Sequence, residues 1–420
     1  MSYSITEKDR QILRELARKQ LYMANQESNL KKMQEWYLHN DLKGERPMIH
    51  LELGTFQNEV IPKRLRCETP FARSLETRLY DNFINQEIFD DDKVTPDYFG
   101  MGYDSWFTLF NIPIKIEHIK GDAQCLGHHF VSQIGDLEED YEKLGETDFG
   151  VNLESTNERK AAIEEIFGDI LPVKLTMGSL YSVPTQMLVH FMSMEQMFMN
   201  MMDYPELFLQ MMDRIVDDTN AYYRMLEEKQ LILPTTECNG VGNGTFAFTN
   251  ELPKSAEELG RPLTSKDVWG FMDSQETVGI SSQMFEELIF PCYQKIAKNY
   301  GLMSYGCCEP VDFIWDNCLS KLDNLRKVSI SPWCNEEFMG ERLRGSKVIY
   351  HRKPSPNYLG VDRVLDEEAF RSHIRKTLEA ARGCKLEFSQ RDVYTIHNSE
   401  EKARRYVAII REEIENHWKN

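Results

Sequence analysis

The chain has 420 residues and a formal net charge of −19, from 49 lysines and arginines against 68 aspartates and glutamates. Hydrophobic residues make up 41% and charged residues 28%, a balance typical of a globular protein with a large core. The negative charge argues against a nucleic-acid partner, because phosphate backbones would be repelled. No apolar run approaches the ~20 residues that span a bilayer, so we expect no membrane partner and a cytoplasmic location.

The first part of the chain is polar and charged, with helical periodicity. We assign residues 1–60 to a helical amino-terminal extension and residues 61–420 to the main domain. In the first half of that domain only one strand is distinct, at residues 173–177. The glycine-rich segment 239–245 lacks the lysine of a phosphate-binding P-loop, so we expect a flexible loop at the mouth of the domain.

From residue 264 onward, short apolar strands alternate with helices. The expected strands are 268–273, 302–306, 328–331, 348–351 and 385–389. The expected helices are 282–299, 311–319, 336–343, 366–382 and 399–418. This alternation implies parallel strands joined by right-handed crossovers. The number of units favours an α/β fold of the (β/α)8 TIM-barrel type, with an open doubly wound sheet as the alternative.

The strand ends select the candidate site residues. In a parallel barrel the catalytic side chains lie just after the strands, at the carboxyl-terminal face. The residues at these positions are Asp273, Glu276, Tyr305, Cys307, Cys308, Glu309, Ser331, Trp333, Arg352, Lys353, Arg391 and Asp392.

The turn Cys307-Cys308-Glu309 is the most reactive of these positions. Two thiolates and a carboxylate are a possible donor set for zinc with an open catalytic position. Adjacent strand residues point to opposite faces, so both thiols reach one metal only if the chain turns, as Gly306 and Pro310 permit. The equally weighted alternative is that one cysteine packs in the core and the other lines a pocket. The nine cysteines are scattered and odd in number, which argues against a disulfide framework.

Two basic positions are candidates for substrate binding. Arg352 and Lys353 can hold a carboxylate or phosphate, the arginine through paired hydrogen bonds and the lysine as a point charge. A solvated loop edge explains them equally well. For Arg391 and Asp392, a substrate contact and an internal ion pair at a strand end are equally weighted.

Several segments resemble the uroporphyrinogen decarboxylase superfamily. They are the run Pro205-Glu-Leu-Phe-Leu with Asp213-Arg-Ile-Val-Asp-Asp, the helix reaching Phe290-Pro291, and the strand opening with Gly301-Leu302. The resemblance spans residues 171–418 and implies a (β/α)8 barrel. The superfamily includes tetrapyrrole decarboxylases and methyltransferases that serve corrinoid proteins.

The Gly306-Cys-Cys-Glu-Pro310 turn is similar to a demethylase branch of this superfamily, which passes methyl groups to a corrinoid protein. Cys307 stands where zinc methyltransferases have the cysteine of His-x-Cys, whereas Tyr305 replaces the histidine. Ser389 stands about where their last cysteine is expected. The Arg-Gln-Ala-Gly-Arg-Tyr motif of the decarboxylases has no counterpart. The resemblance implies a corrinoid carried by a partner protein, and zinc as a candidate cofactor.

Our leading hypothesis is a methyltransferase that moves a methyl group from a small methylated donor, such as a methoxylated aromatic, to a corrinoid protein. Ether cleavage needs a polarised or protonated leaving oxygen. We assign that role to Glu309 or a metal, with Tyr305 as a second proton donor. Asp273, grouped with the catalytic residues, would orient the substrate together with Glu276 and Asp392. Further contacts are expected from Trp333 and Ser331.

Two other functions stay open. The first is a cofactor-independent decarboxylase of an acidic substrate such as uroporphyrinogen, which would bind carboxylates through Arg352, Lys353 and Arg391. The second is a non-catalytic protein that binds a corrinoid or tetrapyrrole. A homodimer is the candidate assembly.

Overall fold

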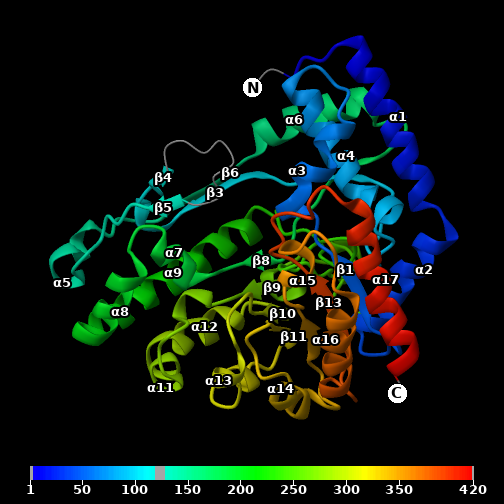
Figure 1. Cartoon of the computed structure of the whole chain (residues 1–420). Coiled ribbons are helices and arrows are strands. Elements are labelled where there is room, and N and C mark those ends of the chain that lie inside the picture. Colours follow the sequence, from blue (N-terminus) through cyan, green and yellow to red (C-terminus); the bar gives the residue numbers. More distant parts are fainter. Residues whose placement is uncertain (1–2, 119–127, 419–420) are drawn as a thin grey trace.

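The computed structural model describes residues 3–118 and 128–418. Its centre is a seven-stranded sheet in the order β1-β13-β12-β11-β10-β9-β8, and every neighbouring pair is parallel (Figure 1). The strands are β1 (Met48–Leu51), β8 (Leu180–Tyr181), β9 (Trp269–Met272), β10 (Leu302–Tyr305), β11 (Leu325–Ile330), β12 (Ile349–Arg352) and β13 (Leu386–Gln390). The predicted α/β class is therefore confirmed.

The five strands predicted beyond residue 264 all form, as β9 to β13, and they are consecutive neighbours in the sheet. Each is short and almost wholly buried, as expected for strands covered on both faces. The helices that follow them are α11 (Ser282–Met284), α12 (Phe290–Ala297), α13 (Asp312–Trp315), α14 (Glu336–Leu343), α15 (Asn357–Gly360), α16 (Glu367–Ala380) and α17 (Glu400–His417).

One predicted helix, at 282–299, is interrupted. A π-helical turn, Phe285–Ile289, separates α11 from α12. Pro291 at the second position of α12 explains the break, because it has no backbone N–H to continue the ladder of hydrogen bonds.

The expected helical extension over residues 1–60 also contributes a strand to the central sheet. Two helices, α1 (Glu7–Ala24) and α2 (Glu27–Asn40), come first, and β1 then pairs with β13. The four residues of β1 are all buried, which an apolar run of this kind requires. The α3 helix (Gln57–Val60) follows.

The middle of the chain builds smaller sheets outside the central one. The strand predicted at 173–177 forms as β7 (Val173–Leu175), but it pairs in parallel with β2 (Phe99–Met101) rather than with the central sheet. Two antiparallel pairs extend to the left in Figure 1. These pairs are β3 (Asp104–Thr108) with β6 (Asp148–Asn152), and β4 (Ile116–His118) with β5 (His128–Phe130).

The remaining helices surround these sheets. They are α4 (Pro70–Ile88), α5 (Leu137–Asp140), α6 (Leu153–Phe167), α7 (Pro184–Val189), α8 (Met194–Asp203), α9 (Pro205–Glu228) and α10 (Ala256–Leu259). The longest, α9, packs on α12, so the amino-terminal half of the chain is joined to the central sheet through helix packing. Within the described ranges, no helix is both long and apolar enough to cross a membrane.

A fully buried ion pair lies inside the sheet. Lys327 on β11 donates to Glu387 on β13 at 3.0 Å, and both side chains have no exposed surface. His39 of α2 contacts the same carboxylate at 3.0 Å. Burial alone would raise the pKa of Glu387, but Lys327 and the neighbouring histidines hold it well below its ordinary value. The carboxylate therefore stays charged, and it ties α2 to the central sheet.

Removing one partner of this pair should be costly, because it leaves an uncompensated buried charge. We expect Lys327→Met to lower the free energy of unfolding by about 3–5 kcal/mol. The double variant Lys327→Met/Glu387→Gln removes both charges and should be clearly more stable than Lys327→Met alone. Urea denaturation of the three proteins measures this difference. A double variant that is less stable than Lys327→Met would contradict the coupling.

Candidate functional site

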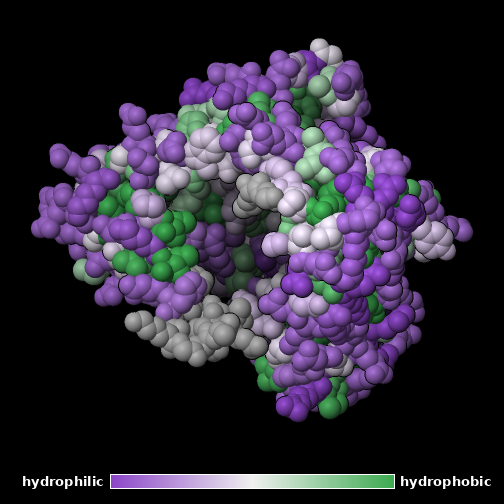
Figure 2. All heavy atoms as spheres, turned by 90° about the horizontal axis from the view of Figure 1, so that it is seen from above, coloured by the Kyte–Doolittle hydropathy of each residue, from purple (hydrophilic) through white to green (hydrophobic). Residues whose placement is uncertain are grey.

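A pocket of about 490 Å³ lies at the carboxyl ends of the central strands. The surface is hollowed at the centre of the face seen in Figure 2. Most of the residues that strand position selected are brought together here. Those that line the pocket are Asp273, Cys307, Cys308, Trp333, Lys353, Arg391 and Asp392.

The turns after β9 and β10 are held together by one buried carboxylate. The Glu309 side chain is 1% exposed and accepts the backbone N–H of Ser274 at 3.0 Å and that of Cys307 at 2.8 Å. Gly306 precedes this turn with a φ of +96°, a backbone conformation that favours glycine. Glu309 therefore shapes the site through the backbone and does not line the pocket itself.

Asp273 is the carboxyl group at the buried side of the pocket. It directly follows β9, is 2% exposed, and its Oδ1 has no hydrogen-bond partner among the described residues. Burial raises its pKa well above the ordinary value, and the nearby charges of Glu309 and Cys307 raise it further. This environment favours the protonated carboxyl, so Asp273 has the properties of a proton donor.

The two adjacent thiols form a pair, with their Sγ atoms 3.5 Å apart. The pKa of Cys307 is lowered to about 7, mainly by the hydrogen bond from Cys308, while burial opposes this and Lys353 and Arg391 support it. The same hydrogen bond raises the pKa of Cys308. Cys307 is therefore the thiolate of the pair near neutral pH, and Cys308 is its hydrogen-bond donor.

The cations of the pocket are partly engaged by protein groups. Lys353 donates to the Cys307 carbonyl at 2.9 Å. Arg391 pairs with Glu52 at 2.6 Å, lies 3.7 Å from the Cys307 Sγ atom and also contacts Asn243. These contacts hold both cations beside the thiolate and fix their orientation.

Several predicted site residues lie outside the pocket lining. Arg352 points between the sheet and its helices, where it pairs with Glu336 at 2.9 Å. Side chains alternate along a strand, so Lys353, the next residue, reaches the opposite side and the pocket. The Tyr305 hydroxyl is fully buried and lies 2.6 Å from the Ser274 hydroxyl. The structure therefore does not bring Arg352 or Tyr305 to the pocket.

Glu276 and Ser331 are also buried beside the site rather than on its surface. Glu276 accepts a hydrogen bond from the Thr185 hydroxyl at 2.8 Å. The Ser331 hydroxyl accepts from the backbone N–H of Trp333 at 3.3 Å and supports the turn after β11. Trp333 itself is 68% exposed and lines the pocket.

The predicted zinc donors Cys307, Cys308 and Glu309 are not gathered into one ligand group within the described residues. Both oxygens of Glu309 are occupied by backbone N–H groups, so this carboxylate does not join the thiols. The Cys308 Sγ atom lies 3.2 Å from an Asp392 carboxylate oxygen, and its single proton can be donated either to this oxygen or to Cys307. Within residues 3–118 and 128–418, no group of three or more histidine, cysteine, aspartate or glutamate side chains could hold a metal ion.

Several residues at the site were not predicted, and three of them make contacts that shape it. Tyr181 of β8 and Asn243 of the glycine-rich loop line the pocket, and Glu52 pairs with Arg391. The loop itself was expected at the mouth, and Asn243 donates to the Gly306 carbonyl there. Glu52 follows the apolar run of β1, so the rule applied to the later strands would have selected it.

No protein-family model matches this chain, and no curated protein matches it. The fold and the site geometry therefore carry the functional argument. They define an α/β protein with a polar pocket where its parallel strands end.

Replacing Glu309 should test its role in shaping the turns. In Glu309→Gln a single amide oxygen replaces two carboxylate oxygens as hydrogen-bond acceptor. The NH2 group then faces a backbone N–H donor. We expect the free energy of unfolding to fall by about 1–3 kcal/mol. Urea denaturation measures it, with Glu341→Gln on the exposed face of α14 as the control. Equal stability of both variants would show that the carboxylate is not needed.

Thiol alkylation should distinguish the two cysteines. We expect the rate of Cys307 modification by iodoacetamide to rise with pH around a midpoint near 7, because the thiolate is the nucleophile. Cys308→Ala removes the hydrogen bond that stabilises this thiolate, so the midpoint should move to higher pH. Peptide mass spectrometry with fragment assignment measures each site. A midpoint that is unchanged in Cys308→Ala would contradict the pairing.

Proposed function

We propose that this protein is a methyltransferase that takes a methyl group from a small methylated donor and passes it to a corrinoid carried by a partner protein. The observation that supports this most is Asp273. A buried carboxyl group whose pKa is raised lies on the wall of an open pocket, and its Oδ1 atom has no hydrogen-bond partner among the described residues. Such a group can protonate the leaving oxygen of an ether.

The proposed reaction is a direct displacement. The reduced corrinoid of the partner protein would supply the electron pair that displaces the methyl carbon, and the carbon–oxygen bond would break. The bonding pair stays on the leaving oxygen, which takes the proton of Asp273. The Asp273 carboxylate is reprotonated from solvent. Lys353, whose charge lowers the pKa of Asp273, would offset the negative charge that Asp273 carries after the transfer.

The proposed roles differ from those that the sequence indicated. Asp273 takes the role of proton donor in place of Glu309, which holds the turns, and of Tyr305, which is enclosed in the core. Trp333, exposed at the rim, is positioned to contact the substrate or the corrinoid face.

We also propose that the central sheet belongs to a closed eight-stranded barrel. The sheet has two edge strands, β1 and β8, and the separate parallel pair β2–β7 provides further strands. A hydrogen bond from Thr176 to the Met101 carbonyl continues the β2–β7 ladder beyond its last paired residues. With β2 and β7 between β1 and β8, and with β7 and β8 counted as one strand position because they are separated by only residues 176–179, the strand number is that of a TIM barrel.

A decarboxylase of an acidic substrate is the second candidate. It is favoured by the two cations, Lys353 and Arg391, which both line the pocket. Both already have protein partners, which leaves less of their charge for substrate carboxylates. Release of carbon dioxide from an acidic substrate without any methyl transfer would favour this function over the first.

The role of Asp273 can be tested by methyl transfer to free cob(I)alamin, with 1,2-dimethoxybenzene as the donor and absorbance spectroscopy as the measurement. We expect Asp273→Asn to lower the rate by about 10²–10⁴-fold, the usual contribution of a general acid. The matched control is Asp316→Asn at an exposed aspartate directly after α13 that pairs with Arg342, and this variant should retain the wild-type rate.

The reaction rate and the stability should each depend on pH in a defined direction. Asp273 must be protonated to act, so the rate should fall as pH rises through its raised pKa. The folded state also holds this proton more tightly than the unfolded chain. Its contribution to stability is therefore present below pH 3.8 and is lost as pH rises through the raised pKa. Wild-type rates in Asp273→Asn, or a rate that rises with pH in this range, would contradict the proposed role.

A further inference from the structure

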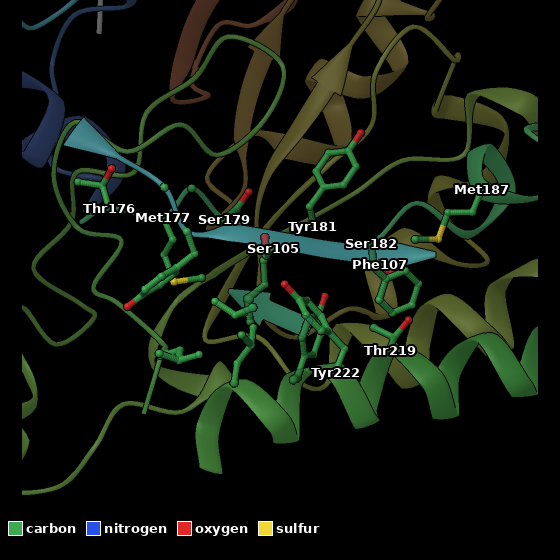
Figure 3. Close-up of a pocket in the computed structure, with 18 residues that line it drawn as sticks. Ser105, Phe107, Thr176, Met177, Ser179, Tyr181, Ser182, Met187, Thr219 and Tyr222 are labelled. Carbon is green, nitrogen blue, oxygen red and sulfur yellow. The ribbon is translucent and has the colours of Figure 1, made fainter. Parts of the chain in front are cut away.

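A second cavity, of about 430 Å³, lies beside the pocket at the strand ends (Figure 3). Its walls come from β3 and β6, from the segment between β7 and α7, and from α9. Phe107 and Ser105 project from β3, and Thr219 and Tyr222 face them from α9. This volume falls within the range of small-molecule binding sites.

The lining of this cavity is uncharged. Eighteen residues line it, and none of these described residues is an aspartate, glutamate, lysine, arginine or histidine. The neighbouring pocket, in contrast, contains two carboxyl groups, two thiols and two cations. A charged ligand would lose its hydration in this second cavity without gaining a counter-ion, so the lining selects against carboxylates and phosphates.

Aromatic rings form much of the wall. The Tyr222 ring lies edge-on to Phe107, with centroids 5.5 Å apart and planes at 70°. Burial raises the pKa of Tyr222 and that of Tyr103, which keeps both phenols neutral. Rings in this arrangement favour a flat aromatic ligand, which can add further edge-to-face or offset contacts.

Two hydroxyl groups in the wall have no hydrogen-bond partner in the described part of the chain. Ser182 is 1% exposed and Thr219 is 3% exposed, and neither oxygen is paired within the described residues. Buried hydroxyls of this kind are costly unless they are satisfied. Each oxygen has almost no accessible surface in this conformation, so a ligand oxygen would provide the missing partner once the hydroxyl rotates toward the cavity.

The cavity adjoins the proposed reaction site through one side chain. Tyr181 lines both spaces and stacks on Phe271, with centroids 5.1 Å apart and planes at 17°. Burial raises its pKa, and the charges of Asp273 and Cys307 add to this effect, which places its hydroxyl near those groups. A molecule in the cavity would therefore lie next to the pocket that contains Asp273.

We infer that this cavity binds an uncharged, oxygen-bearing aromatic molecule of one or two rings. The further assignment of that molecule as the methyl donor rests on the proposed function, whereas binding itself does not. The ring would pack against Phe107 and Tyr222, and a ligand oxygen would accept from Ser182 or Thr219. The end of the ligand next to Tyr181 would face the reaction site.

Isothermal titration calorimetry on the full chain, without a corrinoid, tests the binding. The probes are 1,2-dimethoxybenzene and its carboxylated counterpart, 3,4-dimethoxybenzoate. We expect the uncharged compound to bind at least tenfold more tightly than the carboxylate. Equal or tighter binding of the carboxylate would overturn the inference. Because no methyl transfer is involved, this result is independent of whether the proposed reaction occurs.

Three variants locate the binding site. Phe107→Ala and Tyr222→Ala should each weaken binding of 1,2-dimethoxybenzene by at least fivefold, while Tyr22→Ala, a 68%-exposed tyrosine on α1, should leave it unchanged. Circular dichroism checks that each variant is folded. Unchanged binding in both folded cavity variants would place the ligand elsewhere and overturn the inference.

A substitution that adds a positive charge to the cavity wall gives a second, independent test. Ser179 lines the cavity and is only partly buried, so Ser179→Arg can be accommodated and adds a cation to the uncharged wall. We expect this variant to bind 3,4-dimethoxybenzoate at least tenfold more tightly than the wild type does. No gain in a folded variant would contradict the location of the site.

Discussion

The candidate site depends on one buried carboxylate, that of Glu309. Its two oxygens accept backbone N–H groups from two different strand-end turns, and this joins the segment after β9 to the segment after β10. The first turn carries Asp273 and the second carries the two thiols. The same negative charge raises the pKa of Asp273. A single side chain thus sets both the geometry of the pocket and the protonation of its candidate acid.

The pocket at the strand ends and the second cavity differ in chemistry because different elements build them. The pocket at the strand ends is charged, since parallel strands direct several loops with polar residues to one edge. The second cavity is lined by one strand pair, by one side of α9 and by the short segment that includes β8, all of which contribute uncharged side chains. Tyr181, in the short strand β8, separates the two. The candidate acid therefore lies in a pocket that shares Tyr181 with an uncharged cavity lined by aromatic rings.

The strand-end rule predicted the site well where a side chain's surroundings follow from its place in a strand. Asp273, Cys307 and Lys353 all line the pocket, as expected. The rule predicted positions less well where a side chain points to the other face of the strand or is held by local contacts. Arg352 directly precedes Lys353 and therefore points to the opposite face, toward Glu336. Glu309 was expected to bind a metal or to protonate the leaving oxygen, but its hydrogen-bond partners are backbone groups, which no side-chain pattern reveals.

The amino-acid sequence by itself determined the α/β class, the five consecutive carboxyl-terminal strands and the turn that carries the thiols. These features depend on local apolar patterning and on Gly306, and both are short-range properties of the chain. Only the tertiary structure decided that β1 joins β13, that Glu309 holds two turns, and that β3 and α9 enclose a cavity. Each of these contacts joins elements that are distant along the chain or pairs a side chain with the backbone. The spacing of residues in the sequence predicts neither kind of contact.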